Sequence, residues 1–497
     1  MRSGDRGSGI GEHGATELEV RNFIRGEFVA PRSDEWLGII EPAAGEIIGR
    51  VADSGREDVD AAVAAARDAF PAWRSTSADE RSRKLEALAN LIEEHLDELA
   101  ELESRDNGKP VSLARAIDIP RAVLNFRFFA GAVRHDFTEF HQTDGVALNY
   151  TLRQPLGVAG LISPWNLPLY LLTWKIAPAI ATGNTCVAKP SELTPLTAMR
   201  LGELANDAGI PPGVINIVHG RGRVAGAAIT SHPDVPLISF TGGTATGENV
   251  MNAAGPLFKK ISLELGGKNP NVIFADADLE EAIPASIRSS FSNQGEICLC
   301  GSRIFVERAI HDDFVERFVE ETRKLRVGDP REDATDVGAV ISAAHREKVE
   351  RYVRLAEEEG GKLVTGGRRP SDLPERIRNG FYLEPTVITG LGTGCRVLQE
   401  EIFGPVVTIT PFDDEEEAVR FANSTKYGLS ATVWTSNLKR AHRIAAAIDS
   451  GTVWVNTWLL RDLRVPFGGV KASGVGREGG RHSIEFFTEA KNVCVKL

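Results

Sequence analysis

Two apolar stripes with helical spacing run through residues 59–99. A Ser77-x-x-Glu80 pair lies between them and matches a capping box that starts the second helix. Helices of this kind bury the apolar stripe against the rest of the fold, so we interpret both stripes as packing faces. Their apolar members recur every three or four residues: Val59, Ala62, Val63, Ala66, Ala69 and Phe70, then Leu85, Leu88, Ile92, Leu96 and Leu99.

From Gly157 onward, short apolar runs alternate with helical stretches. This alternation predicts a parallel sheet with helices on both faces, an arrangement that binds dinucleotides. After Glu264 a second α/β region begins. The predicted strands are 157–162, 185–189, 214–218, 237–240 and 260–264 in the first region, with a helix at 195–208, and 271–274, 303–306, 406–410 and 452–455 in the second.

Composition and charge exclude several classes of protein. A chain of 497 residues is too long for one ordinary domain, so we expect two or three. The net charge of −12 argues against nucleic-acid binding, which needs clustered Lys and Arg. Five cysteines, a small and odd number, imply no disulfide framework, so we expect a reducing, cytoplasmic setting.

No membrane segment is predicted. The most apolar region, 156–181, is interrupted by Pro164, Pro168, Lys175 and Pro178, so it offers no clean run of about 20 apolar residues. The first 16 residues lack the apolar core of a signal peptide. They are rich in Gly, Ser and charge, and we expect a disordered extension.

One cysteine stands in a polar turn. Cys298 lies in the stretch FSNQGEICLCGSR, residues 291–303, between a helical pattern and a strand-like run. A cysteine in a loop can meet a substrate as a nucleophile, whereas structural cysteines usually sit in apolar runs. Gly295 before it and Arg303 after it complete a pattern that resembles the active-site signature of the NAD(P)-dependent aldehyde dehydrogenases. The resemblance covers nearly the whole chain, from about Phe23 to Leu497.

This resemblance implies the fold and its divisions. We expect an α/β aldehyde dehydrogenase fold with a Rossmann-like NAD domain, an α/β catalytic domain and a β oligomerisation arm. The arm implies a homodimer or homotetramer, although by sequence alone its segments could be edge strands of any sheet. The expected ranges are 1–18 for the disordered extension, 19–137 and 153–263 for the NAD-binding domain, 264–482 for the catalytic domain, and 138–152 with 483–497 for the arm.

Three residues match the catalytic positions of the family. Cys298 would attack the aldehyde as a thiolate and give a thiohemiacetal. Asn166, in SPWNLP directly after a strand, would donate its amide to the developing oxyanion. Glu264, among apolar neighbours in LELGGK, should have a raised pKa and would activate water for thioester hydrolysis. The plainer alternatives are an inert buried thiol, a turn asparagine and a solvated carboxylate.

The other cysteines and Lys175 are not assigned a catalytic role from the sequence. Cys298 and Cys300 lack zinc spacing and no matching Cys/His pair lies nearby, so we expect no metal. Cys300, Cys186 and Cys494 are interpreted as structural. Lys175 is equally compatible with a proton path and with a structural role.

The match also implies NAD as the cofactor. Lys189 and Glu192 fall at the adenine ribose, where a carboxylate binds both hydroxyls and repels a 2′-phosphate, so we expect NAD and not NADP. A turn after the fourth strand opens a helix whose amides can meet the pyrophosphate. For Glu401, a helix-capping pair with Glu400 is the open alternative. The implied cofactor residues are Trp165, Lys189, Glu192, Gly222, Thr241, Gly242, Gly243, Glu401 and Phe403.

Three arginines are candidates for substrate binding. Arg121 and Arg461 align with positions that are apolar or aromatic in relatives acting on simple aldehydes, and Arg464 lies close to the second. Two arginines that converge on one pocket would bind a carboxylate. The alternative is surface ion pairing, with Asp118 or Asp462 as partners.

The arginine segments and the GEICLC turn resemble a narrower group that oxidises 2-aminomuconic and 2-hydroxymuconic 6-semialdehydes. Such substrates carry a carboxylate at the end opposite the aldehyde. The expected function is NAD-dependent oxidation of 2-aminomuconic 6-semialdehyde to 2-aminomuconate. A 2-hydroxymuconic semialdehyde dehydrogenase and a broader aldehyde dehydrogenase are the alternatives. A catalytically silent relative is disfavoured by the intact Cys298, Asn166, Glu264 and Glu401.

Overall fold

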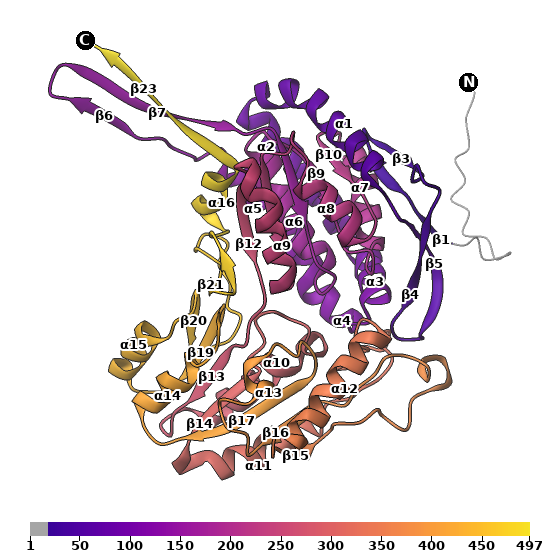
Figure 1. Ribbon diagram of the computed structural model, residues 1–497, viewed down its shortest axis with the longest axis vertical. Helices are drawn as coiled ribbons and strands as arrows, with labels where there is room; N and C mark the ends of the chain where they lie inside the picture. Colours follow the sequence, from indigo (N-terminus) through magenta and orange to yellow (C-terminus); the bar gives the residue numbers. More distant parts are fainter. Residues whose placement is uncertain (1–17) are drawn as a thin grey trace.

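The computed structural model describes residues 18–497. The predicted extension lies outside the described residues except for Leu18, which is the first residue of strand β1. Two large sheets with their helices form an upper and a lower part in Figure 1, and a narrow strand arm projects from the upper part. A small sheet near the N-terminus adds β1 (Leu18–Val20), β4 (Trp36–Glu41) and β5 (Glu46–Ala52).

The two apolar stripes form helices, but the second stripe is divided. Ser77 caps the second helix by accepting a hydrogen bond from the Glu80 backbone N–H. His95 leaves the helical conformation (φ −101°, ψ 23°) and separates two helices at this point. The helices are α1 (Arg56–Ser75), α2 (Ala78–Glu94), α3 (Leu96–Asn107), α4 (Val111–Leu113), the single π-helical turn η1 (Ala114–Asp118) and α5 (Ile119–Ala132).

An eight-stranded sheet carries the five strands predicted in the first region. These five run parallel in the order β12-β11-β8-β9-β10, which confirms the predicted parallel sheet. Antiparallel strands extend both edges. The strands are β8 (Val158–Ile162), β9 (Thr185–Lys189), β10 (Ile215–Ile217), β11 (Leu237–Thr241) and β12 (Lys260–Glu264), with β2 (Asn22–Ile24), β3 (Glu27–Val29) and β22 (Gly474–Val475) at the edges.

The sheet grows on both sides of β8, the first of its five parallel strands along the chain. β9 and β10 are added on one side of β8, and β11 and β12 on the other. In an open parallel sheet, ligands bind at the carboxyl ends of the strands where the order reverses, here between β8 and β11. The helices of this part are α6 (Pro168–Ala181), α7 (Leu196–Asp207), η2 (Gly222–Gly226), α8 (Ala227–Thr230), α9 (Thr244–Ala254) and η3 (Gly255–Leu257).

A seven-stranded sheet forms the lower part, with β15 as its only antiparallel strand among the described residues. All four strands predicted here are present, and β15, β16 and β19 are additional. The order is β15 (Lys362–Thr365), β16 (Thr386–Thr389), β17 (Val406–Phe412), β14 (Arg303–Glu307), β13 (Pro270–Ile273), β19 (Ser430–Trp434) and β20 (Thr452–Val455).

Helices and short turns complete the lower part (Figure 1). They are α10 (Leu279–Phe291), η4 (Ser292–Gly295), η5 (Arg308–Ile310), α11 (His311–Thr322), α12 (Ala343–Glu358), η6 (Glu375–Ile377), α13 (Arg396–Gln399), α14 (Glu415–Ala422) and α15 (Leu438–Ala447), with the short strands β18 (Tyr427–Gly428) and β21 (Val470–Lys471). The last helix, α16 (Gly480–Phe487), packs against α6 of the upper part, at the base of the arm (Figure 1).

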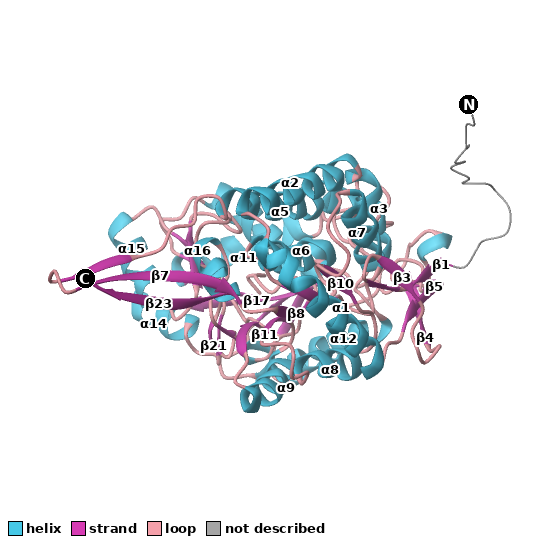
Figure 2. Ribbon diagram, turned by 90° about the horizontal axis from the view of Figure 1, so that it is seen from above, coloured by secondary structure: helices cyan, strands magenta, loops and turns pink. Residues whose placement is uncertain are grey.

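The arm is a three-stranded antiparallel sheet that extends away from both parts, as Figure 2 shows. It contains β6 (Phe140–Thr143), β7 (Ala147–Pro155) and β23 (Thr488–Lys496), so the two ranges expected to form an arm do pair with each other. Across residues 18–497, none of the helices is long and apolar enough to span a bilayer.

Candidate active site

The carboxyl ends of β8, β11 and β12 bring the predicted catalytic residues together. Asn166 follows β8 by four residues, and Glu264 is the last residue of β12. In the sheet register, Glu264 lies opposite Thr241 at the end of β11. Cys298 arrives from the other sheet, in the turn between η4 and β14. The site therefore forms between the two large sheets.

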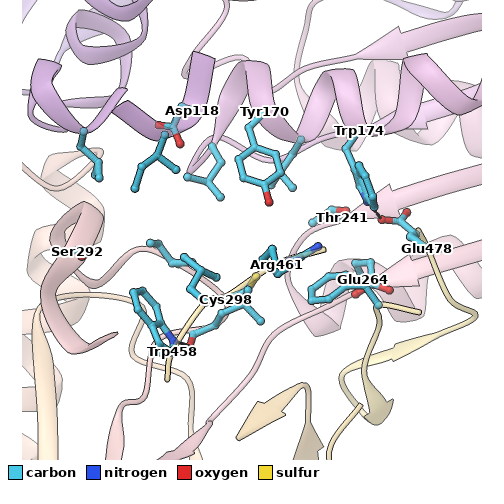
Figure 3. A pocket seen from close by; sticks show the side chains of 18 of the residues that line it. Asp118, Tyr170, Trp174, Thr241, Glu264, Ser292, Cys298, Trp458, Arg461 and Glu478 are labelled. Atoms are coloured by element: carbon cyan, nitrogen blue, oxygen red, sulfur yellow. Dashed lines mark hydrogen bonds between the residues drawn. The ribbon is translucent and has the colours of Figure 1, made fainter. Parts of the chain in front are cut away.

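Two neighbouring pockets meet at Cys298. One is mostly apolar and contains Glu264, Trp458 and Arg461 (Figure 3). The other contains Asn166, Glu401 and the Thr241-Gly-Gly turn. The thiol residue is partly accessible, as a nucleophile must be.

The turn that carries Cys298 begins with strained backbone. Asn293 and Gln294 have positive φ angles of 52° and 56°, which non-glycine residues seldom adopt. Gly295 follows with φ 73°, and a Cβ at this position would collide with the carbonyl of Gly404. The glycine of the signature is therefore required both by its conformation and by the close approach of another chain segment.

Asn166 is buried, and both its side chain and its backbone carbonyl form hydrogen bonds. Its side-chain Nδ2 donates to the Glu296 carbonyl at 2.9 Å. Its own carbonyl accepts from Lys109 Nζ at 3.1 Å and from Asn293 Nδ2 at 3.0 Å. An amide has two N–H donors, so one remains for a ligand. These bonds fix the asparagine against the nucleophile turn.

Glu264 is buried and neither of its carboxylate oxygens has a hydrogen-bond partner. Burial raises the pKa of Glu264 well above the ordinary carboxyl range, and the charge of Glu478 raises it further. A solvated strand-end carboxylate would have neither property. A carboxyl group with this environment suits a general base that works near neutral pH.

Burial also raises the pKa of the Cys298 thiol to about 12, with added contributions from Glu401 and Glu264, while Arg461 acts in the opposite direction. The thiol is therefore protonated at neutral pH in this state of the protein. Attack on a carbonyl requires that its proton be removed. Two carboxyl groups, those of Glu264 and Glu401, line the two pockets that meet at this thiol.

Lys175 belongs to a buried polar network that the sequence did not reveal. Its Nζ donates to Glu478 Oε1 at 3.1 Å and to Ser239 Oγ at 2.9 Å. Trp174 Nε1 donates to the other oxygen of Glu478 at 2.6 Å. Glu478 reaches the pocket from a distant turn, 303 residues after Lys175, and no local motif marks it.

Most residues expected to bind the nicotinamide half of the cofactor line one pocket. Trp165, Glu401 and Phe403 lie there together with Thr241, Gly242 and Gly243. Glu401 Oε1 accepts from the Gly267 N–H at 2.9 Å, so it does not act as a helix cap. His345 and Lys348 of α12 also line this pocket and were not predicted, because they carry no recognisable motif.

The residues expected at the adenine ribose lie beside one another. Lys189 Nζ donates to Glu192 Oε2 at 3.2 Å, and the Gly222 N–H donates to Glu192 Oε1 at 3.3 Å. Gly243 is the N-cap of α9, has no side-chain cap, and leaves open space around its Cα. Free N–H groups at an open helix N-terminus suit a phosphate, so the chain fits a dinucleotide.

The structure places the three arginines in different environments, two near the pocket of Cys298 and one on the surface. Arg461 lines the pocket of Cys298 and its guanidinium stacks on the Phe467 ring at 3.8 Å. Arg121 lies over the rings of Tyr170 and Trp174, which line the same pocket.

Buried nitrogens of two of these arginines lack partners: Arg461 Nε and Arg121 Nη2. Arg464 is exposed and forms an ion pair with Asp462 at 2.6 Å. The alternative of surface ion pairing thus applies to Arg464, whereas Arg461 and Arg121 each retain a buried nitrogen that can donate a hydrogen bond to a ligand.

Comparisons with known proteins agree with this geometry. The model of the aldehyde dehydrogenase family matches residues 28–493. The 2-aminomuconic semialdehyde dehydrogenase of Bos taurus is 55% identical over 481 residues, covering 96% of this chain and 98% of the relative. The 2-hydroxymuconic semialdehyde dehydrogenase of Pseudomonas sp. (strain CF600) is 51% identical over 485 residues, covering 96% and 100%.

A solved structure supports the fold. The crystal structure of an indole-3-acetaldehyde dehydrogenase in complex with NAD+ superposes with a TM-score of 0.94 at 40% identity, covering 97% of each chain. The architecture expected from the sequence is therefore confirmed. On these matches, the chain belongs to the aldehyde dehydrogenase family.

Proposed function

We propose that this enzyme oxidises 2-aminomuconic 6-semialdehyde to 2-aminomuconate with NAD. The relative from Bos taurus that is 55% identical over nearly its whole length is named for this activity. The observation that carries the proposal is a buried, unpartnered nitrogen on Arg461, which lines the pocket of Cys298, and a second one on Arg121, which lies over the pocket residues Tyr170 and Trp174. An unpaired buried donor is costly, and a substrate carboxylate would satisfy both.

The chemistry begins at Cys298. Its sulfur bonds to the aldehyde carbon, and the thiol proton passes to a base in the pocket. The free N–H of the Asn166 amide and the backbone N–H of Cys298 stabilise the resulting oxyanion. When NAD is bound, its nicotinamide ring accepts the hydride that leaves this carbon. The carbon is thereby oxidised and remains attached to Cys298 as a thioester.

Glu264 completes the reaction. Its carboxylate removes a proton from water, the water oxygen bonds to the thioester carbon, and the Cys298 sulfur leaves. The product is a free carboxylic acid. Lys175 and Glu478 are adjacent to this pocket and offer a route by which the proton can leave it.

The chain's own residues also define how the cofactor is held. Glu192 is positioned to accept hydrogen bonds from the adenine ribose, and its charge disfavours a 2′-phosphate, so NAD is preferred over NADP. Gly242, Gly243 and the N-terminus of α9 would hold the pyrophosphate. Glu401, Phe403 and Trp165, which line the same pocket, would hold the nicotinamide end.

The assembly and setting are part of the proposal. The arm, residues 138–152 and 483–497, pairs protomers in a homodimer or homotetramer. Residues 19–137 with 153–263 and residues 264–482 are the cofactor-binding and catalytic domains. The five cysteines are all free, which suits a reducing cytoplasm.

The test compares NADH formation with 2-aminomuconate semialdehyde, 2-hydroxymuconate semialdehyde and hexanal. We expect kcat/KM for the carboxylated substrates to exceed that for hexanal. Arg461→Met should lower kcat/KM for the carboxylated substrates by about 10- to 100-fold, the effect of a lost charged hydrogen bond. Its effect on hexanal should be small, because Met keeps the apolar contact with Phe467.

Arg464→Met is the matched control and should leave the ratio between substrates unchanged. Equal turnover of hexanal by the unmodified enzyme would contradict the carboxylate assignment. A higher kcat/KM for the hydroxy substrate would favour the second candidate, 2-hydroxymuconic semialdehyde dehydrogenase, which the 51% identical Pseudomonas relative supports.

A further inference from the structure

The nucleophile turn, residues 296–300, belongs to no helix or strand, yet each of its backbone carbonyls accepts a hydrogen bond. Between Glu296 and Cys300, the donors are nearby backbone N–H groups and side chains, most of which come from other segments. Ile297 O accepts from the Cys300 N–H at 3.0 Å, and Leu299 O accepts from Trp458 Nε1 at 3.0 Å. The three remaining carbonyls, those of residues 296, 298 and 300, accept hydrogen bonds from side-chain amides.

One asparagine supplies two of these bonds. Asn269 Nδ2 donates to Cys298 O at 2.8 Å and to Cys300 O at 2.9 Å. Its Oδ1 accepts from the Ser430 N–H at 3.1 Å, at the first residue of β19. Its own carbonyl accepts from the Arg303 N–H at 3.2 Å. The buried Asn269 therefore ties the carbonyl of the nucleophile itself to the central strands of the lower sheet.

The segment that contains Gly267 and Asn269 lies close to the nucleophile turn. A Cβ on Gly267 would lie 2.8 Å from both Asn269 Oδ1 and the Cys298 carbonyl. No larger residue fits at position 267 without moving this contact. The fixed carbonyl orients the peptide planes on which the Cys298 N–H and side chain depend.

We propose that Asn269 is a positioning residue of the reaction, which holds Cys298 in register with the Asn166 amide by bonding the two carbonyls that flank Leu299. Its side chain does not contact the reacting atoms and acts through Cys298. A displacement of about 1 Å of a reacting group can cost about 10²-fold in rate. This inference rests on the proposed function in one respect, that Cys298 is the nucleophile.

The test compares Asn269→Ala with Asn271→Ala. Asn271 is a matched control, because it is buried two residues further along, on β13, and uses its amide toward Ser286 and Trp434, away from Cys298. The rate constant of the NADH burst, normalised to active sites that iodoacetamide can label, reports the thioester-forming step.

We expect the N269A burst to slow at least tenfold with the Kd for NAD unchanged, and the N271A burst to stay within twofold of the unmodified enzyme at a similar loss of Tm. Equal slowing in both variants, or no slowing in either, would overturn the inference. If N269A does not fold, Asn269→Ser decides by the same criterion, since one hydroxyl can serve only one of the two carbonyls.

Hydrogen exchange separates this inference from the proposed chemistry. The amides of residues 296–301 should exchange at least tenfold faster in N269A and at an unchanged rate in N271A. Unchanged exchange in N269A would overturn the positioning role. Fast exchange together with the absence of a burst in the unmodified enzyme would mean that the contact holds the turn and that the proposed function is wrong.

Discussion

Cys298, Asn166 and Glu264 lie in three distant segments, and each belongs to a motif short enough to recognise in one sequence. Their environments could not be predicted in the same way. Burial raises the pKa of Glu264 most, and the charged partner that raises it further is Glu478, while one donor that holds the Asn166 carbonyl is Lys109. Both come from elsewhere in the chain and depend on how the sheets pack. Sequence patterns thus predicted the candidate reacting groups, while the residues that set their pKa and orientation required the structure.

A substitution of Glu264 tests its role as the base. Glu264→Gln keeps the shape of the side chain and cannot take a proton from water. We expect kcat to fall about 100-fold, while a burst of one NADH per active site persists, since the hydride leaves before hydrolysis. Stopped-flow absorbance at the NADH band measures both phases.

The pH dependence of Glu264 has a definite sign. Because burial holds its pKa well above the ordinary carboxyl range, the basic form increases as the pH rises through that elevated pKa. The steady-state rate of the unmodified enzyme should therefore rise with pH in that interval, and E264Q should lack this rise. Loss of the burst in E264Q, or an unchanged pH profile, would assign Glu264 to another step.

At the scale of elements, the sequence predicted which strands are present better than it predicted where elements end or how the strands are ordered in the sheet. The five strands of the upper sheet match because each is a short apolar run bounded by turn residues. The single stripe 85–99 became two helices because His95 leaves the helical conformation, which an apolar repeat does not reveal. The strand order, and with it the position of the site between β8 and β11, came from the structure.

The N-terminus of α9 offers a test of cofactor binding at this scale. Gly243→Asp places a good N-cap residue in open space, which should leave Tm unchanged or raise it. The added negative charge would repel the pyrophosphate, so we expect the Kd for NAD to rise about tenfold or more.

Gly243→Ser is the control for this change, because it adds a cap without a charge. The serine hydroxyl can also donate a hydrogen bond to a phosphate, so NAD affinity should be kept or improved. Fluorescence titration with NAD gives both constants. An unchanged affinity in G243D would show that the pyrophosphate does not lie at this helix.

At the scale of the whole molecule, the arm exposes apolar side chains that nothing within the single chain covers among the described residues. Its strands are amphipathic: side chains that lie opposite one another across β6, β7 and β23 include Phe140, Tyr150 and Val493 on one face. Phe140 is 60% exposed and Tyr150 38% exposed. A thin sheet with one apolar face gains its stability by covering that face, and another protomer is the expected cover.

The apolar face predicts how single charges will act on the assembly. Tyr150→Asp should reduce the mass measured by light scattering toward the 53.8 kDa of one chain, because a buried carboxylate without a partner is costly at an interface. Thr151→Asp is the matched control. It introduces the same charge one residue further along β7, where side chains point to the opposite face, and it should leave the oligomer intact. Oligomers of equal mass in both variants would mean that the apolar face of the arm is not the contact between protomers. A monomer that retains NADH formation in Y150D would show that each active site is complete within one chain, as the position of Cys298, Asn166 and Glu264 between the two sheets of a single protomer predicts.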